Sequence, residues 1–467
     1  MIKIGIIGGG FCGMMTATRL VENATIPLEI VLIEPNPEIG KGIAYQSYSD
    51  QHLLNVIASK MSAYDENPNH FLDWVMSQDP YRSEDRELLS RAFLPRNIYG
   101  KYLSDIWKNT LQLAELKKIN IKIIQDVVSD FDIEENFITI FTKKNQEVKV
   151  DYGILATGNL LPRNPKIKNI NFYKEKSNYH QNPWGLESIK NSKKEQKVLI
   201  IGNGLTMVDT VFGLMEDGFS GKILSLSPNG FHLLPHRGNG IVYTKLLEEI
   251  SEDLSLNDLA KTIIKHIRIV RKYGLSAEPV IDSLRPMTQK FWISFSEDQK
   301  KKFLSRFRYL WNIARHRIPL HSHDKIQQYR TSGILQPITG KLIDFTQKGN
   351  GIEVTYFDKK QNKEHHVLVD RVINCTGPES DFSKLENSFI KNKINEGFLV
   401  QDSLKLGLGS HLENFNLKNK EGIVYPHFFT VGSLLKGELW ESTAVGDIRI
   451  HPKKIAENIL TTFLQHA

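Results

Sequence analysis

The same pattern of residues occurs twice in the chain. Residues 150–158 and 369–377 both read V-D-x-x-I-x-x-T-G, and each copy follows two short segments of alternating polar and apolar residues. Such segments on both sides of a polar turn predict a β-hairpin. Each hairpin leads into a strand that ends in Thr-Gly. The repeat therefore predicts an α/β fold with two similar units, in which each hairpin returns the chain to a parallel sheet.

A strand–turn–helix pattern occupies residues 2–21, where an apolar run is followed by G-G-G-F-C-G and a helical segment. Gly8 permits the tight turn, Gly10 lets the backbone approach a pyrophosphate, and Gly13 lets the helix pack on the strand. The next strand ends at Glu34, where a carboxylate accepts hydrogen bonds from a ribose diol. These features predict a dinucleotide site. The alternative is a glycine turn in another kind of α/β protein.

A second such pattern begins with the apolar residues 197–201. Gly202 and Gly204 keep the two glycines that phosphate approach requires, and Thr206 lies in the same turn. Met207 stands where the third glycine is expected, so we expect looser packing of the helix on the strand. The segment predicts a second dinucleotide site with a less complete glycine pattern.

The sequence leaves the nucleotide at this second site open. The strand 222–227 ends in neither an acid for a ribose hydroxyl nor a base for a 2′-phosphate. His232, His236 and Arg237 follow within a few residues. They favour NADPH if they meet a 2′-phosphate, and they are surface loop residues in the alternative interpretation.

A helical region separates the second glycine pattern from the second V-D-x-x-I-x-x-T-G copy. Apolar residues recur every three or four positions over 256–273, and Ser296 and Gln299 form a capping box before a helix that runs toward Ala314. The helix ends at the cationic cluster 315–317. This cluster either complements the helix dipole at a solvated end or binds an anionic group of a cofactor or substrate.

Composition narrows the class of protein. The chain has 467 residues, of which 40% are hydrophobic and 24% charged, as in folded proteins with a core. Its net charge of +7 comes from scattered lysines, so anionic cofactors account for the charge and no nucleic-acid partner is expected. Cys12 and Cys375 are far apart, which argues against a zinc site or a redox-active dithiol. We expect a cytoplasmic protein without a signal peptide, a membrane span or a membrane partner.

Further motifs occur along the whole chain, at residues 40–45, 52–56, 61–62, 96–102, 202–209, 284–286, 315–317, 374–378 and 432–449. Together they resemble the bacterial FAD/NAD(P)-binding proteins. The members of this family look like distant relatives of the class B flavin monooxygenases. The resemblance implies an α/β fold with two Rossmann-like dinucleotide-binding domains, the second inserted in the first, with a helical insertion. The predicted domains are residues 1–185 and 335–467 for FAD, residues 186–245 for NAD(P)H, and residues 246–334 as a helical cap over substrate or cofactor.

The resemblance also implies cofactors and residue roles. FAD is expected at the first site, and NADPH, with NADH as the alternative, at the second. Asn55 would lie beside the flavin as a catalytic amide, or else be a turn residue that satisfies the backbone. Arg96 would contact FAD or substrate. The residues expected to contact a cofactor are Gly8, Gly10, Gly13, Glu34, Gly42, Val128, Thr157, Gly158, Gly202, Gly204, Thr206, Gly377, Gly432 and Thr443.

The implied activity is an NAD(P)H-dependent monooxygenase. It would use molecular oxygen to oxygenate a small nucleophilic substrate, such as an amino acid or another anion, at nitrogen. Because the cofactor supplies this chemistry, no catalytic acid or base is required. A flavin dehydrogenase or reductase without oxygen transfer, and a cofactor-binding protein with little turnover, remain as alternatives.

Overall fold

The computed structural model of the protein describes residues 1–174, 178–237, 241–386 and 388–466. The chain forms two compact units, of which the second is inserted in the first. The first unit contains Met1–Leu160, Pro286–Lys301 and Ser380–Ala467. The second contains Leu161–Arg285 and Lys302–Glu379.

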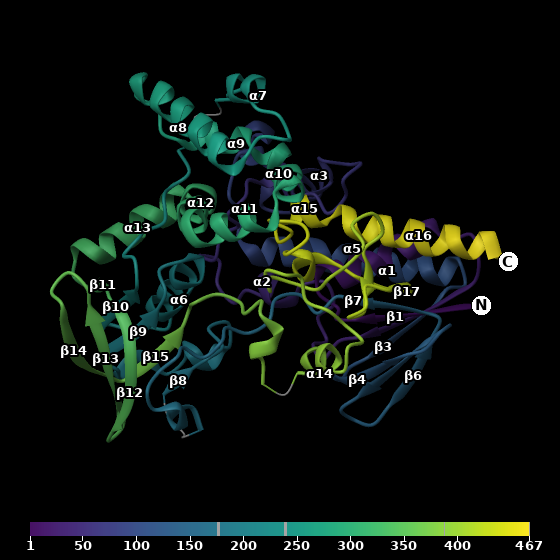
Figure 1. Ribbon diagram of the computed structural model, residues 1–467, viewed down its shortest axis with the longest axis horizontal. Helices are drawn as coiled ribbons and strands as arrows, with labels where there is room; N and C mark the ends of the chain where they lie inside the picture. The colour runs from purple at the N-terminus through teal and green to yellow at the C-terminus, as the bar shows by residue number, and fades with distance from the viewer. Residues whose placement is uncertain (175–177, 238–240, 387, 467) are drawn as a thin grey trace. The chain divides into compact units, whose positions relative to one another are not determined.

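A six-stranded sheet forms the centre of the first unit (Figure 1). All neighbouring strands are parallel except the antiparallel pair β16–β17 at one edge. Its strands, in spatial order, are β16 (Asn416–Lys418), β17 (Val424–Thr430), β7 (Tyr152–Leu155), β1 (Ile2–Ile7), β2 (Leu28–Ile33) and β3 (Asn120–Ile124). β1 and β2 are apolar on both faces, as expected for central parallel strands.

Different elements cover the two faces of this sheet. Ile4 and Ile6 pack with the helices α1 (Phe11–Asn23), α5 (Arg96–Leu116) and α16 (Ile450–His466), which Figure 1 shows along the sheet. On the other face, Ile7 packs with an antiparallel three-stranded sheet and with α14 (Phe389–Asn395). The strands of that small sheet are β4 (Val128–Ile133), β5 (Ile138–Thr142) and β6 (Glu147–Val150).

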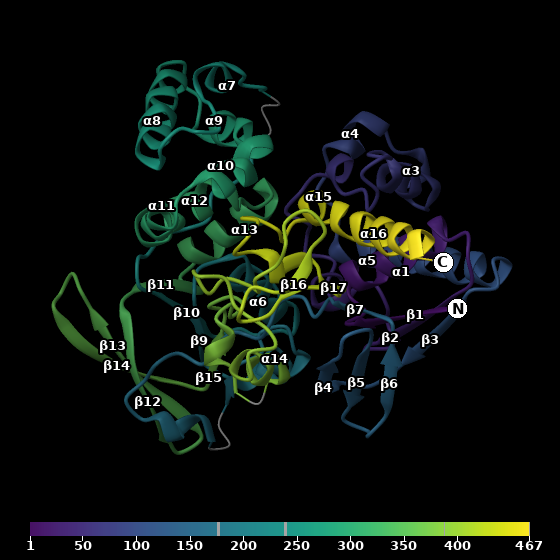
Figure 2. The same cartoon turned by 45° about the vertical axis from the view of Figure 1, so that its right-hand side comes forward.

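The second unit repeats this three-layer arrangement. Its central parallel sheet contains, in order, β11 (Leu335–Thr339), β10 (Lys222–Ser227), β9 (Lys197–Ile201), β15 (Arg371–Asn374) and β8 (Tyr179–His180). One face packs against α6 (Leu205–Glu216) and α13 (Leu320–Thr331). The other packs against the antiparallel strands β12 (Lys341–Lys348), β13 (Gly351–Asp358) and β14 (Lys363–Val369) (Figure 2).

The repeated V-D-x-x-I-x-x-T-G pattern has the same structure in both units. Each hairpin, β5–β6 and β13–β14, is antiparallel and leads into a strand parallel to the first strand of its glycine loop. Asp151 accepts the N–H of Lys3 at 2.7 Å, and Asp370 accepts the N–H of Lys197 at 2.9 Å. The predicted hairpins and the predicted fold class are confirmed.

The compact units divide the chain differently from the predicted domain limits. β8 lies within the predicted FAD domain 1–185, and β11 to β15 lie within 335–467, yet their pairing and packing place them in the second unit. The difference arises because the second hairpin returns the chain to the second sheet, as its sequence similarity to the first hairpin implies.

The predicted helical cap 246–334 is also divided. α13 covers the second sheet, whereas α10 (Thr288–Ser294) lies in the first unit, where the Trp292 indole N–H donates to the carbonyl of Gly437 at 2.7 Å. The remaining helical elements are α2 (Gly42–Tyr45), α3 (His70–Ser77), α4 (Arg86–Ser90), α7 (Lys245–Glu249), α8 (Leu256–Lys272), α9 (Glu278–Ser283), α10 (Thr288–Ser294), α11 (Glu297–Lys302), a π-helical turn (Phe303–Phe307), α12 (Arg308–Arg315) and α15 (Val445–Ile448).

Candidate functional site

The first glycine loop, between β1 and α1, leaves no room for side chains at two positions. Gly8 has φ +104°, its N–H donates to the carbonyl of Ile33 at 2.9 Å, and a Cβ there would lie 2.5 Å from the carbonyl oxygen of Ala156. A Cβ at Gly13 would overlap the carbonyl oxygen of Gly8. The tight turn and the close helix packing therefore both require glycine.

Gly10 instead faces open space. The nearest atom to a Cβ built there is the Cα of Gly42, at 3.7 Å, and Gly42 itself has φ +50°. Gly10 is the N-cap residue of α1, so no side chain at this position binds the free N–H groups of the helix. The first turn of α1 also has no acidic residue. The N–H groups of such a helix end favour an anion, so this space suits a pyrophosphate.

Glu34 is fixed at the end of β2 by two backbone N–H groups. One carboxylate oxygen accepts from Gly9 at 2.7 Å and the other from Asn36 at 2.9 Å. A carboxylate oxygen has two lone-pair positions, so each oxygen keeps one for a ligand hydroxyl. Glu34 therefore keeps the acceptor positions with which a carboxylate at this strand end can bind a ribose diol.

Thr157 and Gly158 follow β7 beside the same loop. The hydroxyl oxygen of Thr157 is buried and has no hydrogen-bond partner among the described residues. Gly158 has φ +67°, and no atom lies within 4 Å of a Cβ built there. A buried polar atom without a partner and an open glycine are the features expected where a cofactor completes the site.

Gly432 joins the first glycine loop to the C-terminal helix. It has φ +74°, and a Cβ there would lie 2.8 Å from the sulfur of Cys12. Its N–H donates to Nδ1 of His451 at 3.4 Å. Burial, with a smaller contribution from the charge of Lys454, lowers the pKa of His451 to about 3, so this imidazole remains neutral and keeps its acceptor nitrogen. Burial also raises the pKa of Cys12 to about 12, as expected for a packing residue.

Asn55 and Arg96 lie on two chain segments that pair with each other. The backbone N–H of Arg96 donates to the carbonyl of His52 at 2.8 Å, and its Nε donates to the carbonyl of Leu53 at 3.1 Å. Arg96 thereby fixes the strand-like segment that ends at Asn55. Arg96 thus binds the backbone two and three residues before Asn55.

The other two predicted residues of the first unit differ in exposure. Val128, which is predicted to contact a cofactor, is 6% exposed and begins β4 in the core. Thr443 is exposed, and it follows Glu441, which has φ +66°. Beside it, Ser442 is fully buried, and its hydroxyl has no hydrogen-bond partner among the described residues.

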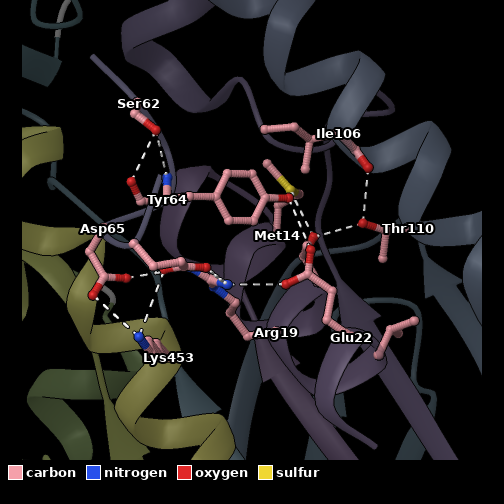
Figure 3. A network of polar contacts seen from close by, with 12 residues as sticks. Met14, Arg19, Glu22, Ser62, Tyr64, Asp65, Ile106, Thr110 and Lys453 are labelled. Atoms are coloured by element: carbon pink, nitrogen blue, oxygen red, sulfur yellow. Dashed lines mark hydrogen bonds and ion pairs between the residues drawn. The ribbon is translucent and has the colours of Figure 1, made fainter. Parts of the chain in front are cut away.

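A buried charge network fastens the segment that follows Asn55 (Figure 3). Arg19 of α1 is 5% exposed and binds the carboxylates of Asp65 at 3.4 Å and Glu66 at 2.5 Å. Lys453 of α16 reaches Asp65 at 3.4 Å. The network joins α1 and α16 to the segment 62–66, and a buried arginine of this kind requires its partners.

The second glycine loop keeps the tight turn but not the close helix contact. Gly202 has φ +112°, and its N–H donates to the carbonyl of Leu226 at 2.8 Å. A Cβ at Gly204 has no atom within 4 Å, so the start of α6 is open. Met207, in the place of the third glycine, is 1% exposed and packs in the core between α6 and the sheet. Thr206 lies in the first turn of α6.

The residue at the end of β10 is the neutral Ser227. Its hydroxyl accepts from the side-chain amide nitrogen of Asn203 at 2.9 Å, and the same nitrogen donates to the carbonyl of Phe231 at 3.3 Å. Gly377, after β15, has φ +89° and open space around its Cα. The hydroxyl of the adjacent Thr376 donates to the side chain of Asn374 at 2.7 Å, unlike that of its counterpart Thr157.

Sequence reasoning missed Asn203 and His451. Asn203 stands between the two glycines of the second loop, and this position was the only available signal. No sequence pattern predicts that His451 meets Gly432, because the contact joins a helix to a turn through tertiary packing.

Two features of the helical region have specific outcomes. The predicted capping box is present: the Ser296 hydroxyl accepts the N–H of Gln299 at 3.3 Å, and the Gln299 side chain accepts the N–H of Ser296 at 2.9 Å. Arg317 of the cationic cluster is 3% exposed and pairs with Asp282 at 2.5 Å and with Glu278 at 3.4 Å. Arg317 is therefore not at a solvated helix end, and its buried Nη1 has no hydrogen-bond partner among the described residues.

Among the described residues, no cluster of three or more His, Cys, Asp or Glu side chains has the arrangement of a metal site. None of the helices in the described part of the chain is long and apolar enough to cross a bilayer.

The two glycine loops, each in its own three-layer unit, define a fold with two nested dinucleotide-binding domains. Residues 5–160 match the model of a family described as FAD-NAD(P)-binding, and they contain the first loop, Glu34 and Thr157-Gly158. No curated protein sequence matches the chain.

Solved structures share the fold across nearly the whole chain. The ornithine N-hydroxylase of Kutzneria sp. 744 is 11% identical, with a TM-score of 0.65 and 99% of each chain covered. The ornithine hydroxylase of Pseudomonas aeruginosa is 13% identical, with a TM-score of 0.63 and 99% of each chain covered. The bacillithiol disulfide reductase of Bacillus cereus is 12% identical, with a TM-score of 0.56 and the same coverage. The chain thus has a fold that N-hydroxylating monooxygenases and disulfide reductases both use.

Proposed function

We propose that the protein is an FAD-dependent oxidoreductase that takes two electrons from NAD(P)H and oxygenates a small, amino-acid-like substrate at nitrogen. The observation that carries the proposal is the presence of two equivalent glycine loops whose strand ends differ, with Glu34 in the first and Ser227 in the second. One chain then holds both an electron donor and an electron acceptor. One atom of molecular oxygen enters the substrate amine, and the other leaves as water.

In this proposal, the first loop binds FAD. Gly10 and Gly42 leave the space for its pyrophosphate, and Glu34 accepts the ribose hydroxyls. Gly8 and Gly13 keep α1 close to the sheet. The residues assigned to the remainder of the cofactor site are Val128, Thr157, Gly158, Gly432 and Thr443.

Asn55 is the proposed catalytic amide, and Arg96 is its positioning residue. Because the Nε of Arg96 is bound to the carbonyl of Leu53, the guanidinium holds the segment that presents Asn55. The bound flavin supplies hydride acceptance and the reaction with oxygen. The chain orients the substrate nitrogen, keeps it neutral and excludes water.

The second loop is assigned to the nicotinamide nucleotide, with Gly202, Gly204, Thr206 and Gly377 near its phosphates. The open Cα positions of Gly204 and Gly377 support this assignment, since no protein atom lies within 4 Å of a Cβ at either one. Met207 does not occupy the proposed phosphate site, because its side chain packs inside the core.

A flavin reductase is the second candidate, since a disulfide reductase shares the fold. The two cysteines argue against a dithiol mechanism. Cys12 and Cys375 lie in different units, and burial raises the pKa of each thiol to about 12. A neutral, buried thiol is a poor nucleophile.

Rapid mixing tests the proposal. The FAD-loaded protein is reduced anaerobically with NADPH and mixed with oxygenated buffer, with and without ornithine or lysine as probe amines. We expect a transient absorbing species before the oxidised flavin spectrum returns, and a hydroxylated amine by mass spectrometry. Direct return to oxidised flavin with every probe amine, and no oxygenated product, would contradict the monooxygenase assignment and favour the reductase.

A further inference from the structure

A cationic pair lies in the second unit beside the second glycine loop. Nη2 of Arg330, near the end of α13, lies 2.9 Å from Nδ1 of His232. Arginine has no acceptor, so Arg330 donates, Nδ1 of His232 accepts, and the histidine carries its proton on Nε2. Burial and the charge of Arg330 lower the pKa of His232, which agrees with a neutral ring. The pair presents only N–H donors to any ligand.

In the described part of the chain, no carboxylate forms an ion pair with either side chain. Among the described residues, Arg330 forms no ion pair, and its buried Nε has no hydrogen-bond partner. Of the nearby candidates from the sequence, His236 lies 3.4 Å from the carboxylate of Glu278, which also accepts the backbone N–H of Arg237 at 3.0 Å. A half-buried guanidinium without an acid is expected to bind an anion.

The chain after β10 places His232 close to the second glycine loop. The Asn203 side chain binds both Ser227 and the carbonyl of Phe231, the residue before His232. The hydroxyl of Ser227 also accepts the N–H of Gly230 at 3.1 Å. The turn 227–231 is thus fastened to the loop between Gly202 and Gly204. The 2′ position of a bound nucleotide lies at this strand end in the dinucleotide-binding fold.

We infer that Arg330 and His232 bind the 2′-phosphate of NADPH and select it over NADH. The inference rests on the proposed nucleotide site at the second loop. At the first loop, the corresponding strand end carries Glu34, whose charge would repel a 2′-phosphate. At the second, Ser227 is neutral, and Arg330 and His232 supply the donors. Arg330 comes from a helix distant in sequence, so the sequence pattern did not reveal it.

Equilibrium binding tests the inference without turnover. NADP⁺, NAD⁺ and 2′,5′-ADP are titrated calorimetrically into the FAD-loaded protein and its Arg330→Gln and Arg330→Lys variants. A hydrogen-bonded charge pair changes affinity by about tenfold to a hundredfold. We expect the wild-type protein to bind NADP⁺ at least about tenfold more tightly than NAD⁺. Arg330→Gln should remove that preference without changing NAD⁺ affinity, and Arg330→Lys should restore part of it.

The matched control is Arg268→Gln on the exposed face of α8, which removes the same charge from the same unit. It should leave both affinities unchanged, and thermal unfolding confirms that each variant is folded. Equal binding of NADP⁺ and NAD⁺ by the wild-type protein, or an equal loss of both in Arg330→Gln, would overturn the inference while the nucleotide site stands. Failure to bind either nucleotide would instead contradict the proposed second site.

Discussion

The two glycine loops share one backbone design but differ in what surrounds it. In both, the loop N–H donates to the end of the neighbouring strand, and an aspartate of the hairpin repeat binds the start of the first strand. The first loop has Gly13 against the carbonyl of Gly8 and the acid Glu34 beside Gly9. The second has a buried methionine and a serine. Both copies of the repeat thus keep the same turn, while the side chains at the strand end differ, and in the proposed function this difference suits each loop to a different nucleotide.

The largest expected effect comes from Gly13→Ala. A methyl group there overlaps the carbonyl oxygen of Gly8, so α1 must move away from β1. We expect purified Gly13→Ala to contain almost no flavin, measured as flavin absorbance per protein. Gly204→Ala is the matched control, because no atom lies within 4 Å of its Cβ, and it should keep its flavin and its fold. Full flavin content in Gly13→Ala would show that the first loop tolerates the looser packing of the second.

Glu34→Gln tests the acid that distinguishes the first loop. The carboxylate binds two backbone N–H groups and, in our account, the ribose of FAD. Hydrogen bonds to a charged group contribute about 1.5–3 kcal/mol, so the dissociation constant of FAD should rise about tenfold to a hundredfold. Reconstitution of the deflavinated protein measures this constant. Ser227→Ala should leave it unchanged, and an equal effect of both substitutions would refute the proposed difference between the loops.

Substitution of the two aspartates of the repeat should have a smaller effect than Glu34→Gln, and the effect should differ between the two units. Asp370 accepts N–H groups from Gln196 at 2.8 Å and from Lys197 at 2.9 Å, whereas Asp151 accepts one from Lys3. Each hydrogen bond contributes about 1 kcal/mol. Asp370→Asn should therefore increase amide exchange in β9 more than Asp151→Asn increases it in β1. The reverse order would contradict the geometry of the two turns.

Acid should loosen the first unit through Glu66. The hydrogen bond from Arg19 lowers the pKa of Glu66 to about 2, below its unfolded value. The stabilisation is therefore present above the unfolded pKa and lost as the pH falls toward about 2. Because Glu66 is 45% exposed, the effect should be below about 1 kcal/mol. As the pH falls toward about 2, the free energy of urea unfolding should decrease more steeply for the wild type than for Glu66→Gln. Parallel curves of this free energy against pH would argue against the ion pair.

No change is expected from Cys12→Ala. The thiol of Cys12, beside the first loop, packs against Gly432, and its raised pKa keeps it protonated. Flavin content and the rate of flavin reduction by NADPH should match the wild type within error. A loss of reduction rate with normal flavin content would indicate thiol chemistry at the first loop and support the reductase alternative.

Much of this comparison could be predicted from sequence. β9 and β10 have the predicted limits, and both hairpins were found, because periodicity and glycine spacing are local signals. The domain limits were less accurate, since the return of the second hairpin to the second sheet is a matter of strand pairing. Arg330 was not predicted, because α13 meets the turn after β10 only in the folded chain. The ion pairs of Arg317 were not predicted, since both of its acids lie on α9.

The most direct test of the account is whether the two loops bind different nucleotides at the same time. NADP⁺ is titrated into the FAD-loaded protein, and the flavin released through a filtration membrane is measured at each point. The account predicts saturable binding of one NADP⁺ per chain with no release of FAD. Displacement of FAD by NADP⁺, or no binding of NADP⁺ at any concentration, would contradict the assignment of separate sites to the two loops.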